Sequence, residues 1–199
     1  MIEKYSQFDE EQHIVRALKE RHGEPGRFLD IGAWNPTCFS NTRALFERGW
    51  SGVMIEPSPE PFLNLLKEYG NEPRVQLVCA AMGWEHGLAK IHATADGVST
   101  LSDDFKEKWK GVGGYYGQFW TTVLTWANVF DQFGGFDFIN IDAEGISAEL
   151  FLKLMDTECR PTCICLEHDG RLVEASQRAT EQGYRITYSN GTNVVMVLP

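Results

Sequence analysis

Six carboxylates follow short apolar runs, where the sequence predicts the ends of β-strands. They are Asp30, Glu56, Asp142, Glu144, Glu167 and Asp169. Ligands of open α/β sheets bind beyond the carboxyl ends of the strands, so we expect these side chains to face one crevice. Carboxylates gathered in this way can bind a cationic ligand, coordinate a metal or take a proton from a substrate. Glu144 and Asp169 can instead cap helix N-termini, which leaves Glu56 and Asp142 as the stronger functional candidates.

The turn after the first predicted strand contains a single glycine, Gly32, within the sequence DIGAWNP. A dinucleotide site needs three glycines there, because backbone amides must approach the pyrophosphate and a helix must pack closely. Pro36 offers no amide, and Asp30 would place a negative charge beside a bound diphosphate. These residues disfavour a nicotinamide or flavin dinucleotide.

The same turn suits S-adenosylmethionine, which carries a sulfonium, an ammonium and a ribose diol but no phosphate. We expect Gly32 to let the backbone approach this ligand. Asp30 is placed to attract its cationic methionine end, and Glu56 is placed to accept hydrogen bonds from the ribose hydroxyls. The predicted cofactor is therefore S-adenosylmethionine.

A hydroxyl that accepts a methyl group must lose its proton, which requires a base within hydrogen-bond reach. Asp142 and Glu144 are the first candidates, and His168 is the third because an imidazole titrates near neutral pH. A metal bound by these three residues together with Glu167 and Asp169 is an alternative. No fixed ligand spacing supports it, so no metal is predicted.

Apolar runs and helical patterns alternate along the chain, which is typical of a parallel sheet covered by helices. Strands are predicted at 27–31, 52–55, 75–80, 136–141 and 162–166, with a terminal hairpin at 184–189 and 193–198. Helices are predicted from Ser6 to about Gly23, around 42–49, and at 59–69, 146–154 and 172–182. The expected fold class is α/β, with a mostly parallel seven-stranded sheet, an antiparallel C-terminal hairpin and helices on both faces.

The 199 residues are expected to form one domain, 1–199, because a chain of this length can bury a core without disulfides or metals. Residues 1–26 are predicted to form an N-terminal helical extension. The pattern loosens between 83 and 136, with a short strand at 89–94 and a strand or helix through Trp126 and Phe130. Within this stretch, 95–126 combines glycines with aromatic residues, which predicts a substrate lid. An interface is the alternative role for this segment.

Two segments carry motifs of a known family. The first runs FLDIGAWNPTCFSNTRALFERGWSGVMIEPSPEPFLNLLKEY, in which residues 56–59 read Glu-Pro-Ser-Pro. The second is FDFINIDAEGISAELF, in which residues 142–145 read Asp-Ala-Glu-Gly. With the loop 80–83 and the acidic strand end 165–167, these segments resemble the FkbM-type methyltransferases. The resemblance covers about 28–169 and departs from the family pattern at 34–36 and in the aromatic insertion.

The resemblance implies a Rossmann-like methyltransferase fold and an S-adenosylmethionine-dependent methyltransferase of the EC 2.1.1 class. The cofactor-binding residues would be Asp30, Gly32, Ala33, Glu56, Pro57, Ser58, Ala81 and Asp142. Substrate binding is expected from Ser99 and Thr100, which with Leu101 resemble the family's Ser-Ser-Leu turn. Tyr115 and Tyr116, flanked by glycines, are expected to bind substrate from the lid.

A small-molecule or sugar hydroxyl is the expected methyl acceptor. The alternatives are an inactive cofactor-binding or interaction module of the same fold and, more weakly, a nucleotide-dependent oxidoreductase. A net charge of −10 argues against a nucleic-acid partner, because such affinity is built largely from Lys and Arg. The chain has no apolar run of a length that crosses a membrane and no signal-peptide pattern at its start, so a cytoplasmic protein is expected. No pattern predicts the oligomeric state.

Overall fold

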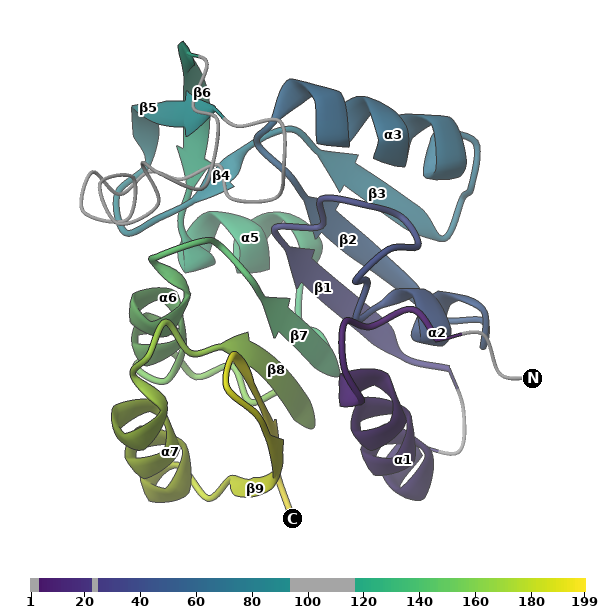
Figure 1. Ribbon diagram of the computed structural model, residues 1–199, viewed down its shortest axis with the longest axis vertical. Coiled ribbons are helices and arrows are strands. Elements are labelled where there is room, and N and C mark those ends of the chain that lie inside the picture. Colours follow the sequence, from purple (N-terminus) through teal and green to yellow (C-terminus); the bar gives the residue numbers. More distant parts are fainter. Residues whose placement is uncertain (1–3, 23–24, 94–116) are drawn as a thin grey trace.

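Seven strands form the main sheet, in the order β3-β2-β1-β7-β8-β10-β9 (Figure 1). The computed structural model describes residues 4–22, 25–93 and 117–199. The parallel strands are β1 (Arg27–Ile31), β2 (Ser51–Ile55), β3 (Val75–Val78), β7 (Phe138–Ile141) and β8 (Cys163–Glu167). β10 (Asn193–Val197) pairs antiparallel with β8 and with β9 (Arg185–Ser189). The predicted fold class is confirmed.

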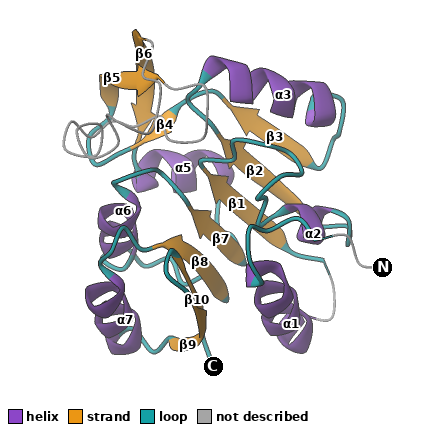
Figure 2. Ribbon diagram, in the orientation of Figure 1, coloured by secondary structure: helices purple, strands orange, loops and turns teal. Residues whose placement is uncertain are grey.

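Helices cover both faces of this sheet (Figure 2). One face carries α1 (Glu10–His22), α2 (Arg43–Phe46) and α3 (Pro59–Tyr69). The other face carries α5 (Trp126–Phe133), α6 (Ser147–Leu154) and α7 (Leu172–Glu181). Successive residues of a strand point to opposite faces. Phe28 therefore packs in the core beneath α1, α2 and α3, while Leu29 and Ile31 pack in the core beneath α5, α6 and α7. The strands are therefore buried on both sides, as their continuous apolar runs predict.

A second, three-stranded sheet extends from the end of β3. It contains β4 (Ala81–Met82), β5 (Gly87–Ala93) and β6 (Gly117–Leu124), in the order β4-β6-β5. β4 runs parallel to β6, and β5 runs antiparallel to it. The sequence patterns predict only part of this sheet, because its own core is limited to a few side chains around Ile91 and Val123. Of the segment 95–126, only the part from 117 onward lies within the described residues, and it forms β6 and the start of α5.

The N-terminal segment differs from the prediction that a helix begins at Ser6. α1 begins at Glu10, and residues 5–9 form a turn around the Glu11 carboxylate, which accepts hydrogen bonds from the N–H groups of Tyr5 and Ser6 at 2.7 and 3.2 Å. The Ser6 hydroxyl accepts a bond from the Glu11 N–H at 3.4 Å. Ser6 and Glu11 are thus reciprocal hydrogen-bond partners, and the helix begins four residues later than predicted.

A buried carboxylate joins this segment to the C-terminal hairpin. Glu10 is fully buried, and its Oε1 accepts hydrogen bonds from the side-chain amides of Asn190 and Asn193 at 2.8 and 2.9 Å. Its Oε2 accepts a bond from the Phe8 N–H at 2.9 Å. The N-terminal segment is therefore held against the same edge of the sheet at which the strands end. Within the described ranges, no helix has the length and apolarity needed to cross a membrane.

Candidate active site

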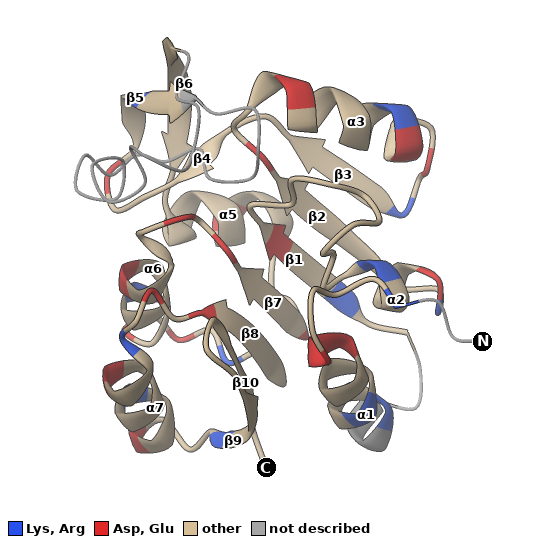
Figure 3. Cartoon of the chain, viewed as in Figure 1, with Lys and Arg blue, Asp and Glu red and all other residues tan. Residues whose placement is uncertain are grey.

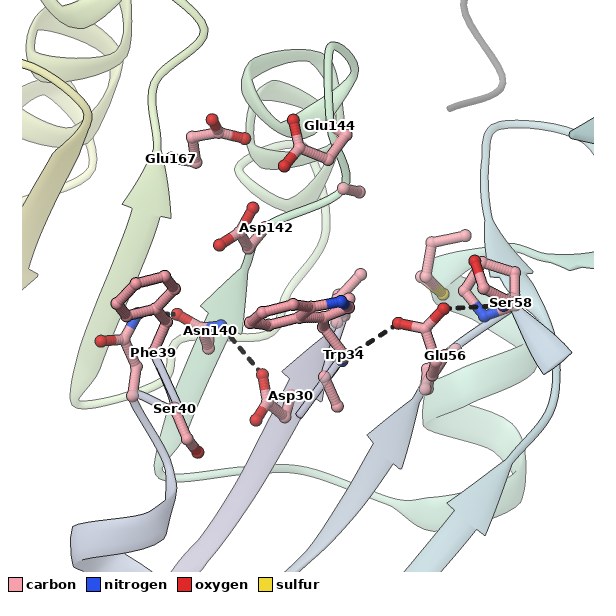
Figure 4. A pocket seen from close by; sticks show the side chains of 18 of the residues that line it. Asp30, Trp34, Phe39, Ser40, Glu56, Ser58, Asn140, Asp142, Glu144 and Glu167 are labelled. Carbon is pink, nitrogen blue, oxygen red and sulfur yellow. Dashed lines mark hydrogen bonds between the residues drawn. The ribbon is translucent and has the colours of Figure 1, made fainter. Parts of the chain in front are cut away.

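A cavity of about 340 Å³ opens at the carboxyl ends of β1, β2, β7 and β8 (Figure 4). Five of the six predicted carboxylates line it: Asp30, Glu56, Asp142, Glu144 and Glu167. Figure 3 shows acidic residues following these strands. Among the described residues that line the cavity, none is lysine, arginine or histidine. The cavity therefore favours a cationic or hydroxyl-rich ligand over a phosphate.

Gly32 brings the first loop against the end of β7. Its φ is +76°, and a Cβ at this position would overlap the carbonyl oxygen of Asp142. The N–H groups of Gly32 and Ala33 both donate to the Ile55 carbonyl, at 2.9 and 3.2 Å, and the Asp142 N–H donates to the Ile31 carbonyl at 3.0 Å. Only glycine satisfies both the positive φ and the close approach, so this residue places Asp142 beside the first loop.

Glu56 is buried at the end of β2, where both of its carboxylate oxygens are engaged by backbone. Oε2 accepts a hydrogen bond from the Trp34 N–H at 3.0 Å, and Oε1 accepts one from the Ser58 N–H at 2.7 Å. Burial raises the pKa of Glu56, and the two N–H groups oppose that rise. The Ser58 hydroxyl is a third donor to this carboxylate. A carboxylate can accept about four hydrogen bonds, so Glu56 retains capacity for a ligand hydroxyl.

Asp30 is buried within a chain of side-chain hydrogen bonds. Its oxygens accept bonds from the Thr42 hydroxyl and from the Asn140 amide, the latter at 2.8 Å. Asn140 in turn accepts a bond from the Asn41 amide at 3.0 Å. The carbonyl oxygen of Asn41 is left without a partner among the described residues. Burial raises the pKa of Asp30, while its two donors lower it.

Asp142, Glu144 and Glu167 form an acidic group in which the carboxylate oxygens lie within 4.8 Å of one another. Burial and the neighbouring carboxylates raise the pKa of Glu167 to about 11, and protonated Glu167 shares a hydrogen bond with Asp142. Burial also raises the pKa of Asp142, to about 6. Near neutral pH the group therefore combines a protonated Glu167 with an Asp142 that is largely ionised.

His168 and Asp169 do not line the cavity. The buried His168 ring accepts a hydrogen bond at Nδ1 from the Gly170 N–H at 3.2 Å, and its Nε2 lies 3.3 Å from the Asn190 carbonyl oxygen. With Nδ1 accepting, Nε2 carries the proton and donates, so both nitrogens are in use. Asp169 accepts bonds from the N–H groups of Gly145 and Ala148, which ties it to the start of α6. These contacts provide no support for the catalytic role expected of His168, which stays an untested prediction.

The remaining predicted cofactor residues lie on the side of the cavity nearest β2 and β4. Pro57, Ser58 and Ala81 all line it, together with the apolar side chains of Met82 and Ile91. This wall is suited to a flat apolar ring. The predicted substrate residues Ser99, Thr100, Tyr115 and Tyr116 lie outside the described residues.

Other cavity residues were not predicted from the sequence. Trp34 and Phe39 project aromatic rings into the site, and Asn140 supplies the amide that binds Asp30 (Figure 4). Gln7 of the N-terminal segment and Asn193 of the C-terminal hairpin also line the cavity. Asn140 is a polar residue inside the buried strand FINI, and that exception to an apolar run is a signal from which it can be found.

In the main sheet one antiparallel strand, β10, lies between β8 and β9, and solved structures of low sequence identity share this fold. The methyltransferase FkbM from Methylobacillus flagellatus KT is similar over 97% of this chain and 56% of that chain, with 12% identity and a TM-score of 0.54. The present chain thus spans about half of that protein.

Two further solved structures are similar over most of their length. A hypothetical protein from Thermus thermophilus matches 98% of this chain and 87% of that chain, with 15% identity and a TM-score of 0.54. Precorrin-6y C5,15-methyltransferase from Geobacter metallireducens GS-15 matches 92% and 85%, with 14% identity and a TM-score of 0.50. No protein-family model matches the sequence, and no curated protein is significantly similar to it. At these identities the similarity establishes the fold.

Proposed function

We propose that the protein is an S-adenosylmethionine-dependent methyltransferase. The observation that carries this proposal is the cavity at the strand ends, which has five acids and no basic residue among its described lining. A nucleotide cofactor with phosphates would meet only negative charge there. A ligand with a sulfonium, an ammonium and a ribose diol complements the same groups.

The residues of the cavity fit this cofactor by the chemistry of their donors and acceptors. Glu56 is placed to accept a bond from the ribose diol, because its carboxylate retains acceptor capacity beyond its bonds to Trp34 and Ser58. Asp30 lies beside the backbone of Gly32 and Ala33 and would attract the methionine ammonium. Pro57, Ser58 and Ala81 would hold the adenine. When bound, the cofactor supplies an electrophilic methyl group.

Asp142 is the base that this arrangement favours for a hydroxyl acceptor. Its pKa of about 6 leaves it ionised near neutral pH while keeping it more basic than an ordinary aspartate. Protonated Glu167 donates to it and holds its orientation, and Glu144 lines the same end of the cavity. The acceptor that we propose is a small-molecule or sugar hydroxyl, whose proton passes to Asp142 as the methyl group is transferred.

The family motifs support a narrower proposal, that the chain is an FkbM-type methyltransferase. The Glu-Pro-Ser-Pro segment at 56–59 and the Asp-Ala-Glu-Gly segment at 142–145 both contribute residues to the cavity. Their place at the ends of β2 and β7 is where a cofactor of this fold binds. Transfer of a methyl group to a hydroxyl acceptor, measured as described below, tests this narrower proposal.

Isothermal titration calorimetry with S-adenosylmethionine and S-adenosylhomocysteine tests the cofactor. We expect both to bind with dissociation constants well below about 1 mM, whereas NAD⁺ does not bind. Absence of binding by both adenosyl ligands at that concentration would falsify the proposal.

Cell extract incubated with the protein and a methyl-labelled donor should then yield an acceptor that gains one labelled methyl group, as detected by mass spectrometry. Cofactor binding without any methylated acceptor would favour the inactive module.

A further inference from the structure

The first loop holds two aromatic residues in a backbone conformation that side chains rarely adopt. The φ angles are +37° at Trp34 and +58° at Phe39. Such values are strained for residues with a Cβ, and they persist where the surroundings impose them. Both residues line the cavity, so the unusual backbone lies at the candidate site.

Contacts from several elements hold the loop in this shape. The Trp34 N–H is bound by Glu56 at 3.0 Å, and the Asn35 side chain accepts bonds from the N–H groups of Thr37 and Cys38 at 3.0 and 2.8 Å. From α3, the Tyr69 hydroxyl donates to the Pro36 carbonyl at 3.1 Å. The loop is thereby a rigid support for the two rings.

The two rings are directed into the cavity instead of into either core. Figure 4 shows the Trp34 indole among the carboxyl groups of Asp30, Glu56 and Asp142. The Phe39 ring stacks on it, with centroids 6.0 Å apart and planes 19° apart. Phe39 is nevertheless 53% exposed, so its position is not explained by burial. Both rings are instead positioned to contact a ligand in the cavity.

We propose that the ring face of Trp34, supported by Phe39, binds the sulfonium of the methyl donor; this rests on the function proposed above. In S-adenosylmethionine the sulfonium lies between the ribose and the ammonium-bearing carbon. The indole likewise lies in the same cavity as Glu56, assigned to the ribose, and Asp30, assigned to the ammonium. Tryptophan attracts a cation over its face more strongly than the other aromatic residues do. The cavity lining holds no lysine or arginine, among the residues described, that would occupy the ring.

This contact gives the site a preference for the donor over the product. S-adenosylmethionine is a sulfonium cation, whereas S-adenosylhomocysteine is a neutral thioether of nearly the same shape. Cation–π attraction therefore acts on the first ligand and not on the second, while Glu56 and Asp30 act on both. The change in the ratio of the two dissociation constants when Trp34 is replaced therefore measures the contribution of this ring.

Calorimetry on Trp34→Leu, Trp34→Phe and Phe39→Leu measures that ratio. We expect Trp34→Leu to weaken S-adenosylmethionine about tenfold relative to S-adenosylhomocysteine, with a smaller loss for Trp34→Phe. Trp84→Leu is the matched control, because Trp84 is 51% exposed and does not line the cavity, and it should leave the ratio unchanged.

The outcomes separate this inference from the proposed function. If the wild-type protein binds both ligands and Trp34→Leu weakens them equally, Trp34 has only a structural role and the inference is overturned. If the wild type binds neither ligand, the proposed function itself fails. Should Trp34→Leu fail to fold by circular dichroism, Trp34→Phe decides, and a ratio identical to that of the wild type overturns the inference.

Discussion

The buried carboxylate of Glu56 accepts a hydrogen bond from the backbone N–H of Trp34, at 3.0 Å. This bond joins the end of β2 to the loop that follows β1. The residue proposed to bind the ribose therefore also sets the position of the ring proposed to meet the sulfonium. Its second oxygen binds the Ser58 N–H at the start of α3, so one side chain organises three segments of the cavity.

Glu56→Gln should weaken S-adenosylhomocysteine binding at least about tenfold, because hydrogen bonds to a charged group contribute about 1.5–3 kcal/mol each. The new amide group would also face one of the two N–H donors that the carboxylate now accepts. Calorimetry measures the affinity. Glu60→Gln, at an exposed position in the first turn of α3, is the control and should bind like the wild type. Equal affinity of both variants would remove the ribose role of Glu56.

Gly32→Ala should lower the free energy of unfolding by about 2 kcal/mol or more, because it combines a strained backbone with steric overlap. The added methyl group would meet the Asp142 carbonyl, at a residue whose φ is +76°. Urea denaturation measures the loss. Gly135→Ala is the matched control, since a Cβ there meets no atom within 4 Å, and it should change stability little. A Gly32→Ala protein as stable as this control would contradict the packing described.

Glu167→Gln should stabilise the protein increasingly as the pH rises. In the folded state the pKa of Glu167 is raised from 4.5 to about 11, so its stabilising contribution is complete below about pH 4.5 and is lost progressively as the pH rises toward 11. Glutamine has no proton to lose and escapes this penalty. Urea denaturation at about pH 5 and about pH 9 should show a larger difference between variant and wild type at the higher pH. The exposed Glu158→Gln should show no such trend, and a pH-independent difference for Glu167→Gln would count against the raised pKa.

His168→Ala should destabilise the fold by about 1–3 kcal/mol without changing cofactor affinity. The buried ring bridges the partly buried Asn190 carbonyl and the Gly170 N–H from a position outside the cavity, so its loss removes both hydrogen bonds and the packing of the ring. Thermal unfolding and calorimetry measure the two effects. The exposed His86→Ala should alter neither. Methyl transfer abolished in a well-folded His168→Ala protein would restore the catalytic role expected from the sequence.

Local patterns predict most elements of the main sheet. The strand 27–31 and the helix 59–69 have the predicted bounds, because apolar periodicity, Pro59 and the flanking turn residues act within a few residues of one another. Of the second sheet, the predicted strand 89–94 corresponds to β5, whereas β4 is missed because it has two residues and depends on pairing with β6, some forty residues away. The start of α1 is misplaced because Ser6 pairs with Glu11 in a turn that precedes the helix, and only the folded segment shows this contact.

For the carboxylates too, the sequence predicts part of the arrangement and only the tertiary structure shows the rest. Five of the six expected acids line one cavity, because the order of a parallel sheet places strand ends at a common edge. The sixth, Asp169, binds the start of α6, and the neighbouring His168 turns toward the hairpin. The sequence places both residues directly after a strand and carries no information about which way each side chain points.

By itself the sequence determined the α/β architecture, the acidic strand ends and the single-glycine turn, because these depend on periodicity and residue type over short distances. Only the tertiary structure decided that Asp142 and Glu167 share a hydrogen bond and that Gly32 lies against Asp142. It also decided that Trp34 and Phe39 face a cavity. These relationships join residues far apart in the sequence, such as Gly32 and Asp142, and the free energy of burial that imposes them exists only once the two cores have formed.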